Sequence, residues 1–477
     1  MDLLQVKGCL IVDAQGRPVR LRGFGVGGWM NTENFINGYP GFESGLRMAV
    51  ADALGAEQAE FLFDRMLDYF LAEPDIAFMK ECGATVVRLP LNYRHFERDR
   101  QPFRYLDPGF ERLNRVIEWC RRHGLHVILD LHAAPGWQDP DWHSDNYGRI
   151  TLIWQHPHFQ DRFVAIWEEL ARRYKGDPVI AGYNIMNEPV TGAPFGFFGF
   201  KYRPDWDVLN RLYRRAVGAI RKIDPEHIIF LEGDFFSVLF SGLESPFADN
   251  LVYSSHNYLK PGFGPGPYPG GSVTGSWDRN RMKQNFMEQE GTVFARQHQV
   301  PLWVGEFGGA FDGPARELRC RLQAIDDQID VFEESGSHWT IWTYKDVGMM
   351  GLVTVNPESE YIRTVAPALK LKRELATDSW VTSQPRTRVK ARVSELGDAV
   401  LKCLPDTGAD PERFKFYLEQ TALAGYVATF MQPVWAKCFA GLSASVLDRV
   451  MQSFAFENCR VNPGLKAILQ RHMARPA

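Results

Sequence analysis

The chain of 477 residues lacks the features that mark disulfide-rich, membrane-spanning or nucleic-acid-binding proteins. Its seven cysteines are odd in number and show no CxxC or zinc-type spacing, so we expect reduced, mostly buried thiols. No apolar run approaches the roughly 18 residues of a membrane span, and the first residues show no signal-peptide pattern. The net charge of −4 provides no basic surface for nucleic acid. We therefore predict a cytoplasmic protein without a membrane span or a nucleic-acid partner.

Aromatic residues, by contrast, are abundant. The chain contains 13 Trp, 16 Tyr and 33 Phe, or 13% of its length. Aromatic planes stack on the apolar faces of sugar rings, but they also fill large cores and interfaces. Composition alone leaves these two interpretations open.

Short apolar segments with strand character alternate with amphipathic helical segments between residues 20 and 376. A fully buried strand is typically a short, continuous apolar run of this kind. The predicted strands are Leu21–Val26, Thr85–Leu89, His126–Leu131, Val179–Met186, Ile228–Leu231, Leu251–Ser255, Leu302–Gly305 and Trp339–Trp342.

Between these strands, apolar residues recur at steps of three and four. The predicted helices are Phe110–His123, Phe159–Tyr174, Val208–Ile223, Arg281–His298 and Ala315–Ser335. Eight β/α alternations favour an α/β fold of the (β/α)8 TIM-barrel type over an open doubly wound sheet. The glycines of Gly23–Gly28 precede a loop rather than a helix, so a dinucleotide-binding fold is disfavoured.

The pattern changes near Arg373. A polar stretch from Thr377 to Val393 is followed by helical segments without strands, which are Glu395–Leu404, Pro411–Met431, Ser443–Phe456 and Pro463–Met473. We predict a barrel domain over residues 1–376 and a helical C-terminal region over residues 377–477. The helices are expected to pack outside the barrel or to shape its mouth, and to offer a surface for a homo-oligomer.

Two of the strand-like segments end on a glutamate, Tyr183–Pro189 (YNIMNEP) at Glu188 and Pro301–Gly308 (PLWVGEFG) at Glu306. The carboxyl ends of barrel strands form the face where catalytic residues lie. Two carboxyl groups at that face suit acid/base and nucleophilic chemistry on a glycosidic bond.

The Asn187-Glu188-Pro189 sequence resembles the acid/base motif of glycoside hydrolase family 5. In that family the acid/base ends strand 4 and the nucleophile ends strand 7. Glu188 and Glu306 end the fourth and seventh predicted strands. The resemblance covers about residues 20–350 and implies a retaining β-glycosidase without a metal or organic cofactor. The chemistry then requires Glu188 to be protonated near neutral pH and Glu306 to be ionised.

Further residues match the family pattern, and the resemblance implies their roles. Arg88 would hydrogen-bond the nucleophile, His132 would lie near the substrate hydroxyls, and Asn187 would contact the 2-hydroxyl. His256 and Tyr258 would orient the two carboxylates, and Trp342 would form the platform under the sugar. Each supporting residue also has a structural interpretation, as an ion pair or as core packing.

Loop residues give hints about substrate. Glu33, with Asn31 and Asn34, follows the first strand and is either a sugar ligand or a solvated loop residue. Trp137 and Trp142 follow the third strand and would form walls of the sugar-binding subsites. Lys345 and Asp346 would add polar contacts from the last strand.

The Phe-rich segment Pro194–Tyr202 would dock on the C-terminal helices or recognise an apolar aglycone.

We therefore predict a retaining β-glycosidase for small β-glucosides or β-gluco-oligosaccharides. β-Mannosides and glycolipid-like β-glucosides remain open as substrates, because one hydroxyl contact decides the epimer. A non-catalytic carbohydrate-binding barrel is the alternative of another class.

Overall fold

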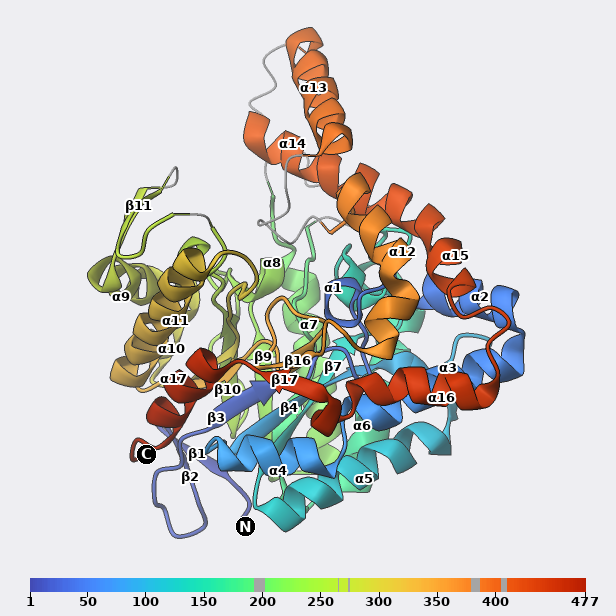
Figure 1. Ribbon diagram of the computed structural model, residues 1–477. Helices are drawn as coiled ribbons and strands as arrows, with labels where there is room; N and C mark the ends of the chain where they lie inside the picture. Colours follow the sequence, from blue (N-terminus) through green and yellow to red (C-terminus); the bar gives the residue numbers. More distant parts are fainter. Residues whose placement is uncertain (193–201, 265, 273–274, 379–386, 405–409) are drawn as a thin grey trace.

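The computed structural model describes residues 1–192, 202–264, 266–272, 275–378, 387–404 and 410–477, and it forms a closed barrel of eight strands ringed by helices (Figure 1). The strands are β3 (Arg22–Gly25), β4 (Val86–Asn92), β7 (His126–Ala133), β8 (Ile180–Asn184), β9 (Ile228–Glu232), β10 (Leu251–His256), β13 (Leu302–Glu306) and β14 (His338–Ile341). They follow one another around the barrel in chain order, and β14 closes it by pairing in parallel with β3. All eight predicted strands and the (β/α)8 fold are thereby confirmed.

The barrel interior is apolar at the amino ends of the strands and polar at their carboxyl ends. Its apolar layer draws one or two side chains from seven barrel segments, together with the hairpin of β1 (Gln5–Lys7) and β2 (Leu10–Val12). Those residues are Leu4, Ile11, Leu21, Val86, Ile128, Ala181, Ile228, Phe230, Val252 and Trp303. Because side chains alternate along a strand, the next inward position after Val86 is Arg88, and after Phe230 it is Glu232. The polar groups of the mouth therefore stand on a rigid apolar base.

Helices cover the outside of the barrel. They include α5 (Asp107–His123), α6 (Pro157–Tyr174), α7 (Trp206–Ile223) and α11 (Ala315–Ser335), as predicted. The predicted helix Arg281–His298 is instead two helices, α9 (Arg279–Glu288) and α10 (Glu290–His298). Gln289 separates them with an extended backbone at φ −63° and ψ 140°.

Three helices between the first two barrel strands were not predicted, namely α2 (Glu43–Leu54), α3 (Ala56–Phe70) and α4 (Glu73–Glu81). In α3 the buried residues Leu62, Phe63, Met66, Leu67 and Phe70 recur at helical spacing. That pattern was available in the sequence. The insertion follows the short helix α1 (Asn34–Asn37), which lies at the barrel mouth.

The C-terminal region packs along one side of the barrel (Figure 1). Its helices are α13 (Arg388–Cys403), α14 (Pro411–Glu419), the π-helical η5 (Gln420–Val427), α15 (Ala428–Lys437), α16 (Ala444–Met451) and α17 (Pro463–Met473), and α12 (Glu360–Leu375) precedes them. The Gln432 amide in α15 donates to the carbonyl oxygens of Pro40 and Phe42, at 3.2 and 2.8 Å.

The expectation that this region lacks strands was wrong. β17 (Cys459–Val461) pairs antiparallel with β16 (Val353–Val355), which in turn pairs with β15 (Lys345–Asp346). A three-residue strand gives too short a pattern to separate from a loop. The boundary near residue 376 stays a prediction, and residues 194–201 of the Phe-rich segment lie outside the described residues.

Two further expectations can be compared with the structure. All seven cysteines are free, but only Cys82 and Cys120 are buried, so the expectation of mostly buried thiols was wrong. Among the described residues, no helix is both long and apolar enough to cross a membrane.

Lys345 and Asp346 do not reach the barrel mouth as polar contacts, and that expectation was wrong. The Lys345 ammonium is fully buried 2.6 Å from the Asp75 carboxylate. It also donates to the carbonyl oxygens of Phe70 and Phe454, each at 2.8 Å. Asp346 is buried and accepts backbone N–H groups of its own loop, including that of Met349. Lys345 therefore joins α4, α3 and the C-terminal region.

Replacing Lys345 with Met removes the cation and leaves the Asp75 carboxyl buried without it. We expect the free energy of unfolding to fall by about 3–5 kcal/mol, as for other broken buried ion pairs. Urea unfolding at pH 7 measures this. The double variant Lys345→Met/Asp75→Asn removes both charges and should recover part of the loss, and a single variant as stable as the parent would contradict the prediction.

Candidate active site

A cavity of about 310 Å³ opens at the carboxyl ends of the barrel strands. Its polar lining is Glu33, His132, Asp141, His143, Glu188, His256, Tyr258, Glu306 and Gln420, and its apolar lining includes Phe35, Trp142, Phe235, Phe236, Val238, Trp342, Phe416 and Tyr417. A larger hollow of about 730 Å³ lies between α2 and α15. Its lining includes Arg94 and Asp99, which pair with each other at 2.6 Å, and also Asp52, Arg100 and Lys437. The smaller cavity is the one that holds both predicted glutamates.

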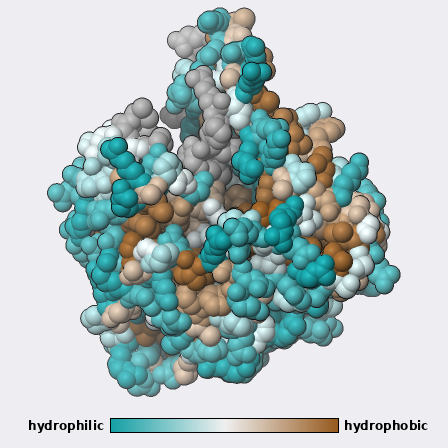
Figure 2. Space-filling view, in the orientation of Figure 1, coloured by the Kyte–Doolittle hydropathy of each residue, from teal (hydrophilic) through white to brown (hydrophobic). Residues whose placement is uncertain are grey.

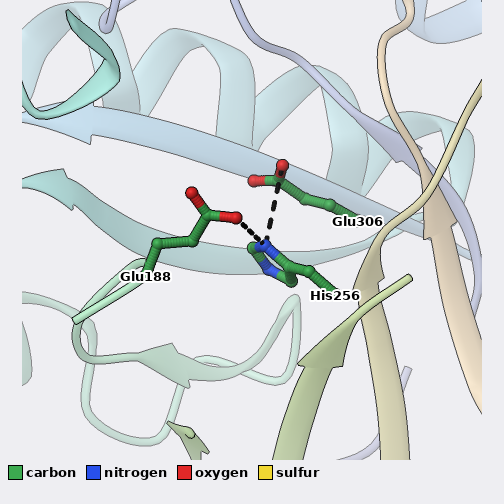
Figure 3. A group of neighbouring side chains, drawn as sticks. All are labelled: Glu188, His256 and Glu306. Carbon is green, nitrogen blue, oxygen red and sulfur yellow. Dashed lines mark hydrogen bonds and ion pairs between the residues drawn. The ribbon is translucent and has the colours of Figure 1, made fainter. Parts of the chain in front are cut away.

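The two predicted glutamates meet in this cavity (Figure 3). Glu188 follows β8, and Glu306 ends β13. One carboxylate oxygen of each lies within 4.8 Å of the other and of a ring nitrogen of His256. Glu188 has a left-handed backbone, with φ of 46°, and its N–H donates to the Glu232 carboxylate at 2.8 Å. Strained backbone of this kind clusters at functional sites.

Glu306 is held by two donors. The Arg88 guanidinium donates to one of its oxygens at 2.5 Å, and the Tyr258 hydroxyl donates to the other at 2.8 Å. The nearest ring nitrogen of His256 lies 3.8 Å away. Fixed donors and a neighbouring cation stabilise the ionised form of a carboxyl group.

Arg88 is the central cation of the site and is fully buried. Besides Glu306, it lies 3.0 Å from Asp130 and 3.5 Å from Glu232. It also donates to the Asn187 side-chain oxygen at 2.7 Å. The Asn187 amide nitrogen lies 3.4 Å from His132 Nε2, so Asn187 links Arg88 to His132 beneath the cavity.

Glu188 lies between two histidines. His256 Nδ1 is 2.6 Å from one of its oxygens, and His143 Nε2 is 3.0 Å from the other. Burial raises the pKa of Glu188, but the charges and contacts of His256 and His143 outweigh it and hold that pKa well below its usual range.

The histidines hold the protons instead. Burial lowers the pKa of His256, yet the charges of Glu306, Glu232 and Glu188 raise it to about 10. Burial likewise opposes protonation of His143, but Asp139 at 3.1 Å and Glu188 raise its pKa well above the usual value. The expectation that Glu188 is protonated near neutral pH does not hold for the ligand-free site, because two imidazolium ions stabilise its carboxylate.

His132 and Trp342 form one wall of the cavity. Their rings stack with centroids 5.3 Å apart and an angle of 3° between planes. His132 Nδ1 lies 2.7 Å from the Asp130 carboxyl group. Burial lowers the pKa of His132 to about 3, so this imidazole is neutral near pH 7. A flat neutral surface of this kind suits one face of a sugar ring.

Of the predicted loop residues, Glu33 and Trp142 line the cavity and Trp137 does not. The Trp142 indole N–H donates to the Glu33 carboxyl group at 3.1 Å. Burial raises the pKa of Glu33 to about 8. Trp137 instead packs on Tyr147 and lines a separate hollow. Its backbone has φ of 58°, which turns the loop so that Trp142 takes the wall position predicted for both.

Asn31 and Asn34 are buried, but they bond within the fold rather than line the cavity. Their amide groups donate to the carbonyl oxygens of His143 and Gly41, at 3.0 and 3.1 Å.

Sequence reasoning missed several residues of the site. Glu232 ends β9, so the signal that identified Glu188 and Glu306 was present there too. Asp130 precedes His132 at an inward-facing step of the same strand. His143 and Asp139 lie in a loop without regular periodicity, and only the folded loop brings them to Glu188.

Glu188, His256 and Glu306 also satisfy the minimum geometry for a metal ion. In this structure these ligand atoms already contact other protein groups. His256 Nδ1 contacts Glu188, and Arg88 donates to an oxygen of Glu306. The donor set therefore fits a hydrogen-bonded carboxyl pair better than a metal-binding site.

Comparison with known proteins is consistent with this geometry. Residues 62–348 match the family model described as cellulase, glycosyl hydrolase family 5. A β-xylosidase of Phanerodontia chrysosporium is 38% identical over 98% of both chains, so the alignment includes the C-terminal region. Endoglucanase C of Acetivibrio thermocellus is 27% identical over 58% of this chain and 85% of its own. A probable glucan 1,3-β-glucosidase A of Emericella nidulans is 26% identical over 70% and 87%.

Solved structures share the fold at lower identity. An endogalactoceramidase has a TM-score of 0.51 and 18% identity, over 72% of this chain and 75% of its own. A structure described as a glycoside hydrolase has a TM-score of 0.50 and 20% identity, over 69% and 90%.

Proposed function

The chain belongs to glycosyl hydrolase family 5, and from that premise we propose that it is a retaining β-glycosidase of small β-glucosides or β-gluco-oligosaccharides. The protein is a glycoside hydrolase that acts on β-glycosides, and the proposal concerns its mechanism and its substrate. Because the family consists of enzymes, we set the non-catalytic binding barrel aside.

One observation carries the proposal of a retaining mechanism. A carboxylate oxygen of Glu188 and one of Glu306 lie within 4.8 Å of each other. Retaining enzymes separate their two carboxyl groups by roughly 5–5.5 Å, whereas inverting enzymes leave roughly 6.5–9.5 Å for a water molecule. The spacing therefore supports direct attack by one carboxylate.

In the first step Glu306 attacks the anomeric carbon, and the bond from that carbon to the leaving oxygen breaks. Arg88 and Tyr258 donate to the two oxygens of Glu306 and orient it for this attack. We expect Asn187 to contact the 2-hydroxyl, as the family resemblance implies, and such a contact strengthens as positive charge develops on the sugar.

The leaving oxygen takes its proton through Glu188. His256 Nδ1 lies 2.6 Å from one Glu188 oxygen, and His143 Nε2 lies 3.0 Å from the other. We infer that a proton passes from one of these histidines to Glu188 when the substrate binds. In the second step Glu188 accepts a proton from a water molecule whose oxygen attacks the anomeric carbon, and the bond from that carbon to Glu306 breaks. Glu188 then returns its proton to the histidine, which restores the starting state.

The size of the cavity supports small substrates. About 310 Å³ is at the lower end of ligand sites. Glu33, whose pKa burial raises to about 8, can both donate and accept a hydrogen bond near pH 7 and would contact a hydroxyl of the glycone.

A β-xyloside is a second candidate substrate. The relative named β-xylosidase aligns over 98% of both chains, which supports this sugar directly. β-Mannosides and glycolipid-like glucosides stay further alternatives, since a single hydroxyl contact separates epimers.

Self-association through the C-terminal helices and a cytoplasmic location stay predictions. Tyr426, Phe430 and Val434 recur at four-residue steps and are exposed by 69%, 68% and 36%. This apolar face lies along η5 and α15, where Figure 2 shows hydrophobic surface.

We expect light scattering to give a mass above that of one chain, and Phe430→Glu to lower it; a single-chain mass for the parent would contradict self-association.

Glu306→Gln should abolish hydrolysis of every substrate in a panel of 4-nitrophenyl β-glycosides (glucoside, xyloside, mannoside, galactoside and cellobioside). We expect kcat to fall at least about 10⁴-fold, as for other lost nucleophiles. The parent enzyme should be labelled on Glu306 by a 2-deoxy-2-fluoroglycosyl fluoride, and peptide mass mapping identifies the labelled residue.

The glycoside of this panel that the parent enzyme hydrolyses fastest identifies the preferred glycone. Glu188→Gln is the matched control, because it should keep the label while losing activity on poor leaving groups. Label on another residue, or inversion of the anomeric centre in the first product seen by NMR, would overturn the mechanism.

His143→Gln removes a positive charge 3.0 Å from Glu188. Because the charge of His143 lowers the pKa of Glu188, its loss raises that pKa, and the proton shared between Glu188 and His256 is kept to higher pH. We expect the alkaline limb of the kcat/KM profile to move up by about 1 pH unit or more, the effect of one adjacent charge.

His132→Gln is the control for that shift. The pKa of His132 is lowered to about 3 by burial, so this substitution removes no charge near neutral pH. Its activity should fall without a shift of the alkaline limb. A limb that stays in place or moves down in His143→Gln would refute the proton route.

A further inference from the structure

We propose that the apolar half of the active-site cavity binds an apolar aglycone, and that the C-terminal helix α14 builds this half. The proposal deepens the proposed function and rests on it. The cavity is lined by the carboxylates and His132 and also by a group of aromatic side chains, Phe235, Phe236, Phe416 and Tyr417, with Gln420 beside them. Phe235, Phe236 and Tyr417 pack in one cluster. The two kinds of lining thus match the two parts of a glycoside whose leaving group is a hydrocarbon or an aromatic ring.

The barrel side of this half is a strained turn. Phe235, Phe236 and Ser237 lie in α8 (Asp234–Ser237) and have left-handed backbones, with φ of 51°, 58° and 62°. Consecutive non-glycine residues in this conformation are unfavourable and persist only where other contacts fix them. Ser237 donates to the Glu232 carboxylate, and Asp234 accepts the Thr191 hydroxyl at 2.6 Å. The turn therefore presents two phenyl rings to the cavity.

The opposite side comes from outside the segment that matches the family model. Phe416 and Tyr417 lie in α14, about 70 residues beyond its end at residue 348. The Arg413 guanidinium lies 5.7 Å from the centre of the Phe235 ring, so α14 contacts the strained turn directly. On its other side, the Lys415 ammonium pairs with Asp398 of α13 at 2.5 Å. The helix is thus fixed between the barrel and its own neighbour.

Two side chains of this wall keep apolar area that a ligand would cover. Phe416 is 48% exposed and Val238 is 41% exposed, although both line the cavity. The charged group beside them, Asp141, is already paired with Arg149 at 3.0 Å. A wall of this kind gains more from burying hydrocarbon than from binding the hydroxyls of a second sugar.

The test compares substrates that share the glycone and differ in the aglycone, namely the methyl glycoside, the n-octyl glycoside below its micelle concentration, and the disaccharide. We expect kcat/KM for the octyl glycoside to exceed that for the methyl glycoside at least about tenfold, because apolar contacts of a few methylenes are worth that much. The disaccharide should not show this gain. Equal values for octyl and methyl glycosides, or a larger gain for the disaccharide, would overturn the proposal.

Phe416→Ala should raise KM for the octyl glycoside about tenfold more than it raises KM for the methyl glycoside, and Phe416→Trp should restore the octyl preference. Tyr426→Ala is the matched control, since Tyr426 is an exposed aromatic residue of η5 that does not line the cavity. An equal loss for both substrates in Phe416→Ala would show a merely structural role.

Calorimetric binding of the n-octyl thioglycoside, which is not hydrolysed, separates this proposal from the proposed function. Binding that Phe416→Ala weakens, in a protein that hydrolyses none of the substrates, would uphold the aglycone site and refute the glycosidase. If the protein hydrolyses the methyl glycoside but does not bind the octyl thioglycoside, the glycosidase is upheld and the aglycone site is refuted.

Discussion

The active site depends on one buried cation. Arg88 lies at the centre of the barrel mouth within 3.5 Å of three carboxyl groups, those of Asp130, Glu232 and Glu306. Carboxyl groups are costly to bury, and the charge of Arg88 lowers the cost of placing these three together away from water. Its contact with Asn187 extends the same network towards His132, which lines the cavity. The apolar layer beneath, with Val86 on the same strand, fixes the backbone from which Arg88 projects.

The two catalytic glutamates near this cation have different hydrogen-bond partners. Glu306 receives donors that do not give up their protons near neutral pH, namely Arg88 and Tyr258. Glu188 instead receives two histidines, which exchange protons readily. The same residue type therefore serves as the nucleophile on one side and as the proton carrier on the other, and the neighbours set the difference.

Much of this was predictable from the sequence, for physical reasons. Barrel strands are buried on both faces, so β4 and β13 read as short apolar runs, and Glu306 at the end of such a run stands at the mouth. His143 was not predictable, because its position depends on an irregular loop. Trp137 and Trp142 look alike in the sequence, and only the backbone turn at Trp137 decides which one reaches the cavity. The position of α14 beside the active-site cavity was not predicted either, because helical periodicity identifies a helix but not the distant surface on which it packs.

The contacts of Arg22 have a consequence for how the protein is made on the ribosome. This side chain begins the first barrel strand and pairs with Glu333, and it also donates to the carbonyl oxygen of Arg475, 453 positions later. Chains emerge from the ribosome amino end first. The first strand thus waits for Arg475 and Pro476 to emerge before all contacts of its buried charge can form. A nascent chain stalled before these residues therefore carries the catalytic carboxylates without a finished scaffold.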